Sequence, residues 1–163
     1  MREPHVELTA DGPEETRRLG RRLAAALSAA DPAGPVFVAL CGELGSGKTT
    51  FVGGVLEALG HPGAVRSPTY TFVEPYSLQG REIHHGDLYR LRDPEEVEDL
   101  GLRELRGGRH WLFIEWPERA GDRLGNADLE VRFDYRDSGR RLRFSAHSPT
   151  GRAIVGHFRL DPD

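Results

Sequence analysis

The fold is decided by a stretch in which an apolar run leads into a glycine-rich loop: Val36-Phe37-Val38-Ala39-Leu40-Cys41 followed by Gly42-Glu43-Leu44-Gly45-Ser46-Gly47-Lys48-Thr49. The loop fits the pattern G-x-x-x-x-G-K-[ST], which would arise by chance in on the order of one in a thousand chains of this composition. The apolar run is typical of a buried parallel strand, and residues 48–59 have the pattern of a helix that ends before Gly60 and Pro62. Strand, loop and helix together predict a phosphate-binding P-loop.

The residue types of the loop have chemical reasons. Glycines let the backbone curl so that successive amides face phosphate oxygens, and the helix N-terminus adds a positive end. We expect Lys48 to bridge the β- and γ-phosphates, Thr49 to bind Mg²⁺ and Thr50 to contact the α-phosphate. Lys48 is the only lysine among 22 basic residues, as expected where a compact ammonium fits and a guanidinium does not. The other predicted phosphate ligands lie earlier in the loop: Gly42, Gly45, Ser46 and Gly47.

The sequence also favours a particular nucleotide and offers two acidic partners for the metal. GTPases usually read guanine through an Asn/Thr-Lys-x-Asp motif, and this chain has no second lysine to make one, so ATP or ADP is favoured. A P-loop needs a carboxylate near Mg²⁺, commonly at the end of a neighbouring apolar strand. Glu115 follows the apolar run 111–114 and Asp87 follows the segment 82–86. Both remain candidates from the sequence.

The rest of the chain predicts one α/β domain over residues 1–163, with a mixed, largely parallel sheet flanked by helices and antiparallel strands at the C-terminal edge. An amphipathic pattern predicts a helix over 14–29, and Asp93-Pro94 starts another that Gly101 ends. Strands are expected at 71–76 and 82–87 as a hairpin, at 111–114, and as an antiparallel group at 129–135, 142–146 and 153–158.

Composition excludes several classes of function. The net charge of −4 gives no broad cationic surface for direct DNA binding, and the longest apolar run is six residues, against about 20 for a membrane span. The single cysteine, Cys41, forbids an internal disulfide and fits a reducing, cytoplasmic setting, with its side chain in the core. The histidines His61, His84 and His85 could form a metal site, but no cysteine or carboxylate other than Asp87 lies at ligand spacing, so polar side chains at strand ends are the favoured interpretation.

Five motifs in order resemble the TsaE (YjeE) family: residues 42–50, Ser67-Pro-Thr-Tyr70, His85-Gly-Asp87-Leu-Tyr-Arg90, Asp93-Pro-Glu-Glu96 and Ile114-Glu-Trp-Pro117. The resemblance covers nearly the whole chain. It implies a bacterial ATPase required for the threonylcarbamoyladenosine modification of tRNA, acting on a complex of TsaB and TsaD that carries out the transfer. The resemblance also implies that tRNA is reached only through that complex.

The resemblance assigns roles to individual residues. It implies that residues 45–50 bind the phosphates, that Thr49 and Glu115 hold Mg²⁺, and that Asp87 contacts the nucleotide or orients water at the metal. Thr69 resembles a switch-like threonine near the γ-phosphate, and Trp116 a tryptophan beside the nucleotide. The catalytic group is then Lys48, Thr69, Asp87 and Glu115. Gly86 departs from the family pattern, which has an aromatic residue there, and leaves open whether His84 or His85 takes the family role.

Two other functions stay open from the residues alone. A small-molecule kinase needs an acceptor pocket and an arginine-bearing lid, but no Asp-x-Asp follows a second strand and no such lid is evident. A binding module without useful turnover is the other alternative. No residue stands out as a water-activating group, so we expect slow hydrolysis that partners accelerate. Three arginines near the motifs are candidates for an arginine finger: Arg90, Arg92 and Arg119.

Overall fold

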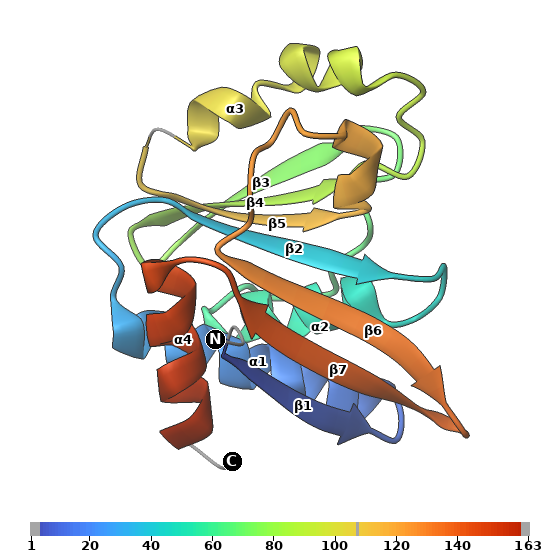
Figure 1. Cartoon of the computed structure of the whole chain (residues 1–163), viewed down its shortest axis with the longest axis vertical. Coiled ribbons are helices and arrows are strands. Elements are labelled where there is room, and N and C mark those ends of the chain that lie inside the picture. Colours follow the sequence, from blue (N-terminus) through green and yellow to red (C-terminus); the bar gives the residue numbers. More distant parts are fainter. Residues whose placement is uncertain (1–3, 107, 161–163) are drawn as a thin grey trace.

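A seven-stranded sheet runs through the computed structural model, which describes residues 4–106 and 108–160 (Figure 1). The strand order is β1-β7-β6-β2-β5-β4-β3. In chain order the elements are β1 (His5–Ala10), α1 (Pro13–Ala30), β2 (Val36–Gly42), α2 (Lys48–Ala58), β3 (Val73–Leu78), β4 (Arg81–Asp87), the 3₁₀ helix η1 (Pro94–Leu100), α3 (Leu102–Leu105), β5 (His110–Glu115), the 3₁₀ helix η2 (Pro117–Ala120), β6 (Leu129–Arg136), β7 (Gly139–Ala146) and α4 (Pro149–Leu160). The single domain predicted over 1–163 includes residues 1–3, 107 and 161–163, which lie outside the described residues.

The centre of the sheet is parallel and its edges are antiparallel. Strand β2 pairs in parallel with both β5 and β6, and β4 pairs in parallel with β5. The hairpin β3–β4 closes one edge, while β7 and then β1 add antiparallel strands at the other. This mixed α/β sheet flanked by helices confirms the predicted fold class. Strand β6 differs in one respect from the prediction, since it is antiparallel only to β7.

Side chains of β2 alternate between two cores on opposite faces of the sheet. Val36, Val38 and Leu40 pack in the core that also contains buried residues of α1, α2 and α4. Phe37 and Cys41 belong to the second core, which η1, α3 and η2 help to form. Figure 1 shows α3 well apart from α1, α2 and α4. Because its side chains are buried on both faces, β2 is an almost uniformly apolar strand, as its sequence predicts.

The backbones of helices α1 and α2 approach each other closely where the two helices cross. A Cβ added at Gly54 would lie 2.0 Å from the carbonyl oxygen of Arg17, and one at Gly20 would lie 2.1 Å from the carbonyl oxygen of Phe51. No residue with a side chain fits at either position without a shift. This contact fixes α2, and therefore the loop that precedes its first residue, against the rest of the domain.

The predicted strand over 153–158 is wrong, because these residues belong to helix α4. Its buried residues, Gly151, Ile154, Val155 and Phe158, recur at the three- and four-residue spacing of a helix face. Ser148 begins the helix: its side-chain oxygen accepts a hydrogen bond from the Gly151 amide at 3.0 Å. The sequence Ser148-Pro149 is typical of a helix N-terminus. This signal outweighs the short alternation of apolar and polar residues that predicted a strand.

Strand β1 is a second departure, because the sequence prediction missed it. Its six residues pair with β7 from His5↔Ser145 to Ala10↔Arg140. The segment predicted to start at Asp93 is present as η1, where Asp93 and Glu96 form a capping box and Gly101 ends the helix. Within the described residues, no helix combines the length and the apolar character that a bilayer crossing requires.

Candidate functional site

The glycine-rich loop curls between the end of β2 and the start of α2. Gly45 and Gly47 have φ values of 77° and 106°, in the left-handed region that residues with a Cβ rarely adopt. A Cβ at Gly42 would also lie 2.8 Å from the carbonyl oxygen of Phe133. The loop therefore needs glycine at these positions for its shape, and it delivers Lys48 and Thr49 as the first residues of α2.

Lys48 lies almost completely buried, at 4% exposure, with its ammonium inside the curl of the loop. Its Nζ donates to the carbonyl oxygens of Gly42 at 2.5 Å and Glu43 at 2.8 Å. It also lies 4.6 Å from the centre of the Trp116 ring. Burial lowers the pKa of Lys48, while the carboxylates of Glu115 and Asp87 oppose that shift. The Lys48 ammonium is thus bound by carbonyl oxygens of the loop itself, and it is the group in the loop that phosphates would attract.

Both candidate carboxylates reach the site. Strands β4 and β5 pair in parallel with Asp87 opposite Glu115, so both side chains leave the sheet at the same edge, 6% and 3% exposed. The hydroxyl of Thr49 lies 2.9 Å from Oε2 and 3.1 Å from Oε1 of Glu115. Asp87 accepts hydrogen bonds from the Ser67 hydroxyl and, at 2.9 Å, from the Tyr89 amide. The site thus contains two negative groups, each held by hydroxyl or amide donors.

Ser67 links a further predicted residue to this cluster. The hydroxyl of Thr69 donates to the oxygen of Ser67 at 3.3 Å, and Ser67 donates in turn to Asp87. The sequence pattern indicated a role for Thr69 and none for Ser67. The signal was available, since Ser67 begins the same Ser-Pro-Thr segment.

A cavity of about 420 Å³ lies over the loop and brings most of the predicted residues together. Ten of the predicted site residues line it: Gly45, Ser46, Gly47, Lys48, Thr49, Thr50, Thr69, Asp87, Glu115 and Trp116. Gly42 contributes instead one of the two carbonyls that hold Lys48. Arg90 lines the cavity as well, and Arg119 lies 5.7 Å from the Trp116 ring, whereas Arg92 does not line it. Leu44, Ser67 and Tyr89 complete the lining without having been predicted.

Trp116 adopts a left-handed backbone conformation, with φ 57° and ψ 49°. Such a conformation is uncommon for a bulky residue and tends to occur at functional sites. Its amide donates to the Leu40 carbonyl at 3.3 Å, and its ring lies 4.9 Å from the Tyr89 ring, centre to centre. The ring is therefore held between Lys48 and Tyr89 at the edge of the cavity.

The histidines His61, His84 and His85 lie in three different environments. His85 is fully buried, and its Nε2 lies 2.6 Å from Oε2 of Glu115. His84 contacts His110 at 3.1 Å on the other face of the strand, and His61 packs edge-on against Tyr76. The histidine beside the carboxylates is therefore His85.

Gly86 separates His85 from Asp87 with almost no room for a side chain. A Cβ at this position would lie 2.7 Å from Cδ1 of Ile114, so the Ile114 side chain occupies the space that a larger residue would need. The strand stays regular here, with Gly86 paired to Ile114 on one side and to Val73 on the other. The departure from the family pattern does not displace Asp87.

A second, smaller cavity lies on another side of the same loop. It has a volume of about 270 Å³ and shares residues 45–47 and Thr50 with the first cavity. Its remaining walls come from the start of α1 and from the β6–β7 turn: Asp11, Gly12, Pro13, Thr16, Ser138, Gly139 and Arg140. Arg140 stacks 4.1 Å from the Tyr135 ring centre and donates to the Gly45 carbonyl at 3.3 Å.

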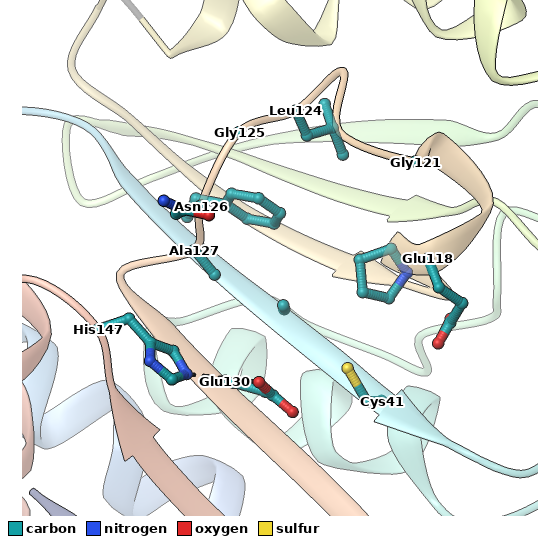
Figure 2. A pocket seen from close by; sticks show the side chains of 12 residues that line it. Cys41, Glu118, Gly121, Leu124, Gly125, Asn126, Ala127, Glu130 and His147 are labelled. Atoms are coloured by element: carbon teal, nitrogen blue, oxygen red, sulfur yellow. Dashed lines mark ion pairs between the residues drawn. The ribbon is translucent and has the colours of Figure 1, made fainter. Parts of the chain in front are cut away.

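A third hollow, of about 540 Å³, contains none of the predicted site residues (Figure 2). It lies over the Cys41 side of β2, where Glu118, Glu130 and His147 surround it. His147 lies 3.4 Å from Glu130. Burial raises the pKa of the Cys41 thiol to about 12, with Glu130 and Glu118 adding to the effect. Cys41 is 8% exposed within the second core, which confirms the prediction that it is a core residue.

Three features place the chain among the P-loop α/β proteins: a buried parallel strand, a loop of the P-loop pattern that curls at its glycines, and a helix that begins at the lysine of the loop. The family model described as "Threonylcarbamoyl adenosine biosynthesis protein TsaE" matches residues 10–142. This protein belongs to the TsaE family, which takes part in tRNA threonylcarbamoyladenosine biosynthesis.

Individual relatives agree with this assignment. The chain is 41% identical over 141 residues to the tRNA threonylcarbamoyladenosine biosynthesis protein TsaE of Haemophilus influenzae, covering 86% of this chain and 89% of that protein. The protein of the same name from Bacillus subtilis is 36% identical over 119 residues, covering 73% and 71%. The crystal structure of Bacillus subtilis YdiB superposes with a TM-score of 0.74 at 22% identity, covering 98% of this chain and 97% of that one. That superposition supports the fold.

Proposed function

We propose that this protein binds Mg-ATP over its glycine-rich loop and hydrolyses it slowly, as a regulatory ATPase acting on TsaB- and TsaD-like partners in tRNA threonylcarbamoyladenosine biosynthesis. The observation that carries the proposal is the contact between Thr49 and Glu115, which joins the last residue of the loop motif to a buried carboxylate. A hydroxyl that donates to a carboxylate keeps its own oxygen lone pairs available for a cation.

The side chains beside the loop suit a magnesium ion and a triphosphate. Mg²⁺ prefers oxygen ligands and is usually bound by one or two protein side chains plus substrate phosphates. Thr49 and Glu115 are such ligands, and Asp87 lies beside them. When bound, Mg²⁺ supplies positive charge that neutralises the phosphate oxygens. Lys48 exchanges the Gly42 and Glu43 carbonyls for phosphate oxygens, which are stronger acceptors because they are charged.

We assign the nucleoside to the cavity of about 270 Å³ on the other side of the loop. The carboxylates lie in the first cavity, so that cavity receives the metal and the terminal phosphates. Thr50 lines both cavities, which supports its role as a contact of the α-phosphate between them. Arg140 and Ser138 then offer hydrogen-bond donors to ATP or ADP, and the buried Nε of Arg140 has no hydrogen-bond partner among the described residues.

We expect slow hydrolysis because both carboxylates at the site already accept hydrogen bonds from other protein groups. Asp87 is already held by Ser67 and Tyr89, and Glu115 by Thr49 and His85. Neither carboxylate is free to activate water, so Asp87 is left to orient a water and Thr69 to approach the γ-phosphate. An arginine finger from Arg90 or Arg119, or a group supplied by a partner, would raise turnover by stabilising transition-state charge.

The rim of the first cavity supports the docking of a protein partner. Among the described residues, four large hydrophobic side chains have high exposure: Leu44 at 63%, Tyr70 at 81%, Tyr89 at 38% and Tyr135 at 52%. Leu44 and Tyr89 line the first cavity, and Tyr135 donates a hydrogen bond to the Leu44 carbonyl. Arginines stack on the tyrosine rings, with Arg90 on Tyr70 and Arg119 on Tyr89. Tyrosine and arginine are enriched at the energetic centres of protein interfaces. TsaB- and TsaD-like proteins would cover the nucleotide there, and tRNA would be reached only through them.

Phosphate release, measured with and without the TsaB- and TsaD-like partners, tests the proposal. We expect slow Mg-dependent release by the protein alone, faster release with partners, and none from Lys48→Ala. Tyr70→Ser is the matched surface variant: it should keep the basal rate and lose much of the stimulation. Unchanged release on mixing would rule out the regulatory role. ADP formation that needs an added small acceptor would indicate a kinase, and nucleotide-dependent partner binding without turnover a binding module.

The proposed setting is the cytoplasm. A single buried cysteine without a disulfide partner fits a reducing compartment, and a net charge of −4 fits a protein that does not itself hold nucleic acid.

A further inference from the structure

His85 is a polar side chain in an apolar column of the core. It projects from β4 on the same face as Ile83, and its register partner on β5 is Phe113. Its exposure is 0%. Burying a polar group without a hydrogen bond is unfavourable, so a histidine at this position needs a compensating contact.

Glu115 provides that contact. Nε2 of His85 lies 2.6 Å from Oε2 of Glu115, whereas Nδ1 has no hydrogen-bond partner among the described residues. Because Nε2 faces a carboxylate oxygen, the ring hydrogen belongs on Nε2 and the ring acts as a donor. The single polar interaction of this buried ring is therefore directed at the predicted metal ligand.

The contact distinguishes the two oxygens of Glu115. Oε2 is shared by His85 and Thr49, while Oε1 has the Thr49 hydroxyl as its only hydrogen-bond partner in the described part of the chain. The donor at Oε2 fixes the plane of the carboxylate by a hydrogen bond from a ring that is itself held rigidly in the core. Oε1 therefore has fewer protein partners than Oε2 and is the oxygen available to a cation.

We propose that His85 is the positioning residue for Glu115: it holds Oε2 so that Oε1, together with Thr49, is presented to the divalent cation. This inference rests on the proposed function, in which Thr49 and Glu115 hold Mg²⁺. Outer partners that orient metal ligands typically contribute about 10- to 100-fold in metal affinity. Asp87 needs no such histidine, because Ser67 and the Tyr89 amide already hold both of its oxygens.

The test compares nucleotide affinity with and without a metal. The Kd of the non-hydrolysable ATP analogue AMP-PNP is measured by calorimetry in EDTA and in Mn²⁺, and the ratio gives the gain due to the metal. The electron paramagnetic resonance spectrum of bound Mn²⁺ provides an independent signature of its ligands. Four variants are compared with the wild type: His85→Leu, His85→Asn, His85→Gln and, as a control on the same strand, His84→Gln.

We expect His85→Leu and His85→Asn to lose about tenfold or more of the metal-dependent gain, with an altered Mn²⁺ spectrum and an unchanged Kd in EDTA. His85→Gln places an amide N–H where Nε2 was, and should keep most of the gain, as should His84→Gln. Asn is shorter and does not reach Glu115, so the Gln–Asn pair decides the question even if the Leu variant fails to fold.

A full metal-dependent gain and an unchanged Mn²⁺ spectrum in His85→Asn would overturn the inference while leaving the proposed function intact. A wild type that binds AMP-PNP in neither condition would instead overturn the proposed function. A wild type that binds the analogue without any gain from Mn²⁺ would overturn the metal role of Glu115 and this inference with it.

Discussion

The hydroxyl of Thr49 lies 2.9 and 3.1 Å from the two carboxylate oxygens of Glu115, although 66 positions separate the residues in the chain. The sheet produces this contact. Strand β2 leads into the loop that ends at Thr49, and Leu40 of β2 is the register partner of Glu115 on β5. Two adjacent parallel strands therefore deliver a hydroxyl and a carboxylate to the same edge.

Thr49→Val and Glu115→Gln test this pair. Each substitution keeps the shape of the side chain and removes an oxygen or a charge at the proposed metal position. We expect Mg-dependent ATP hydrolysis to fall by about 100-fold or more, because stabilisation of developing charge is lost, while nucleotide affinity in EDTA changes little. Phosphate release and calorimetry provide the two measurements.

Glu118→Gln is the matched control for this pair. Glu118 is an exposed carboxylate that lines the hollow of Figure 2, so its loss should leave hydrolysis unchanged. Normal hydrolysis by Glu115→Gln would show that the metal assignment is wrong.

Lys48 gives a prediction about pH. Burial holds its pKa below the ordinary 10.5, and phosphates placed beside it would favour the ammonium and raise that pKa. Between the two pKa values, the free protein has released the proton and the complex keeps it. Nucleotide binding should therefore take up a proton at alkaline pH, between the lowered pKa of the free protein and the raised pKa of the complex, and affinity should fall as pH rises through the pKa of the free protein.

Calorimetry in two buffers of different protonation enthalpy measures this uptake. Because Lys48 is the only lysine in the chain, Lys48→Met is a clean control that should abolish it. Identical binding heats in both buffers for the wild type would contradict the proposed contact between Lys48 and phosphate.

Two adjacent glycines on α2 give opposite predictions for stability. Gly54→Ala places a Cβ 2.0 Å from the Arg17 carbonyl oxygen and should destabilise the fold by about 1–3 kcal/mol, because α1 and α2 must move apart. At Gly53 the nearest atom to an added Cβ is 3.8 Å away, so Gly53→Ala should stabilise the helix by about 0.5–1 kcal/mol. Urea unfolding of both variants measures the difference, and equal midpoints would refute the close crossing.

Cys41 should be unreactive in the native protein. Its pKa is raised to about 12, chiefly by burial, so the reactive thiolate is scarce at neutral pH. Labelling by a disulfide reagent at pH 8 should be roughly a thousandfold slower or more in the native protein than in guanidinium chloride. Rapid stoichiometric labelling of the native protein would show that the strand end before the loop opens readily.

The sequence predicted elements where strong local signals coincide. The helix expected over 14–29 is α1, the apolar run 36–41 is β2, and the helix after the loop is α2, each within about two residues of the expected bounds. The C-terminal segment shows where such signals conflict. Residues 153–158 alternate over a few positions, yet burial against α1 and β7 selects a helix whose apolar face recurs every three to four residues.

The site also has one part that local sequence determines and another that depends on tertiary structure. The sequence by itself determined the loop, with its glycines, lysine and threonine, because these residues act through local backbone shape and their neighbours along the chain. It also supplied two carboxylates and two adjacent histidines without placing them. Only the tertiary structure brought Glu115 and Asp87 together and chose His85 over His84, because strand register and the side on which each residue leaves the sheet are set by pairing between distant segments.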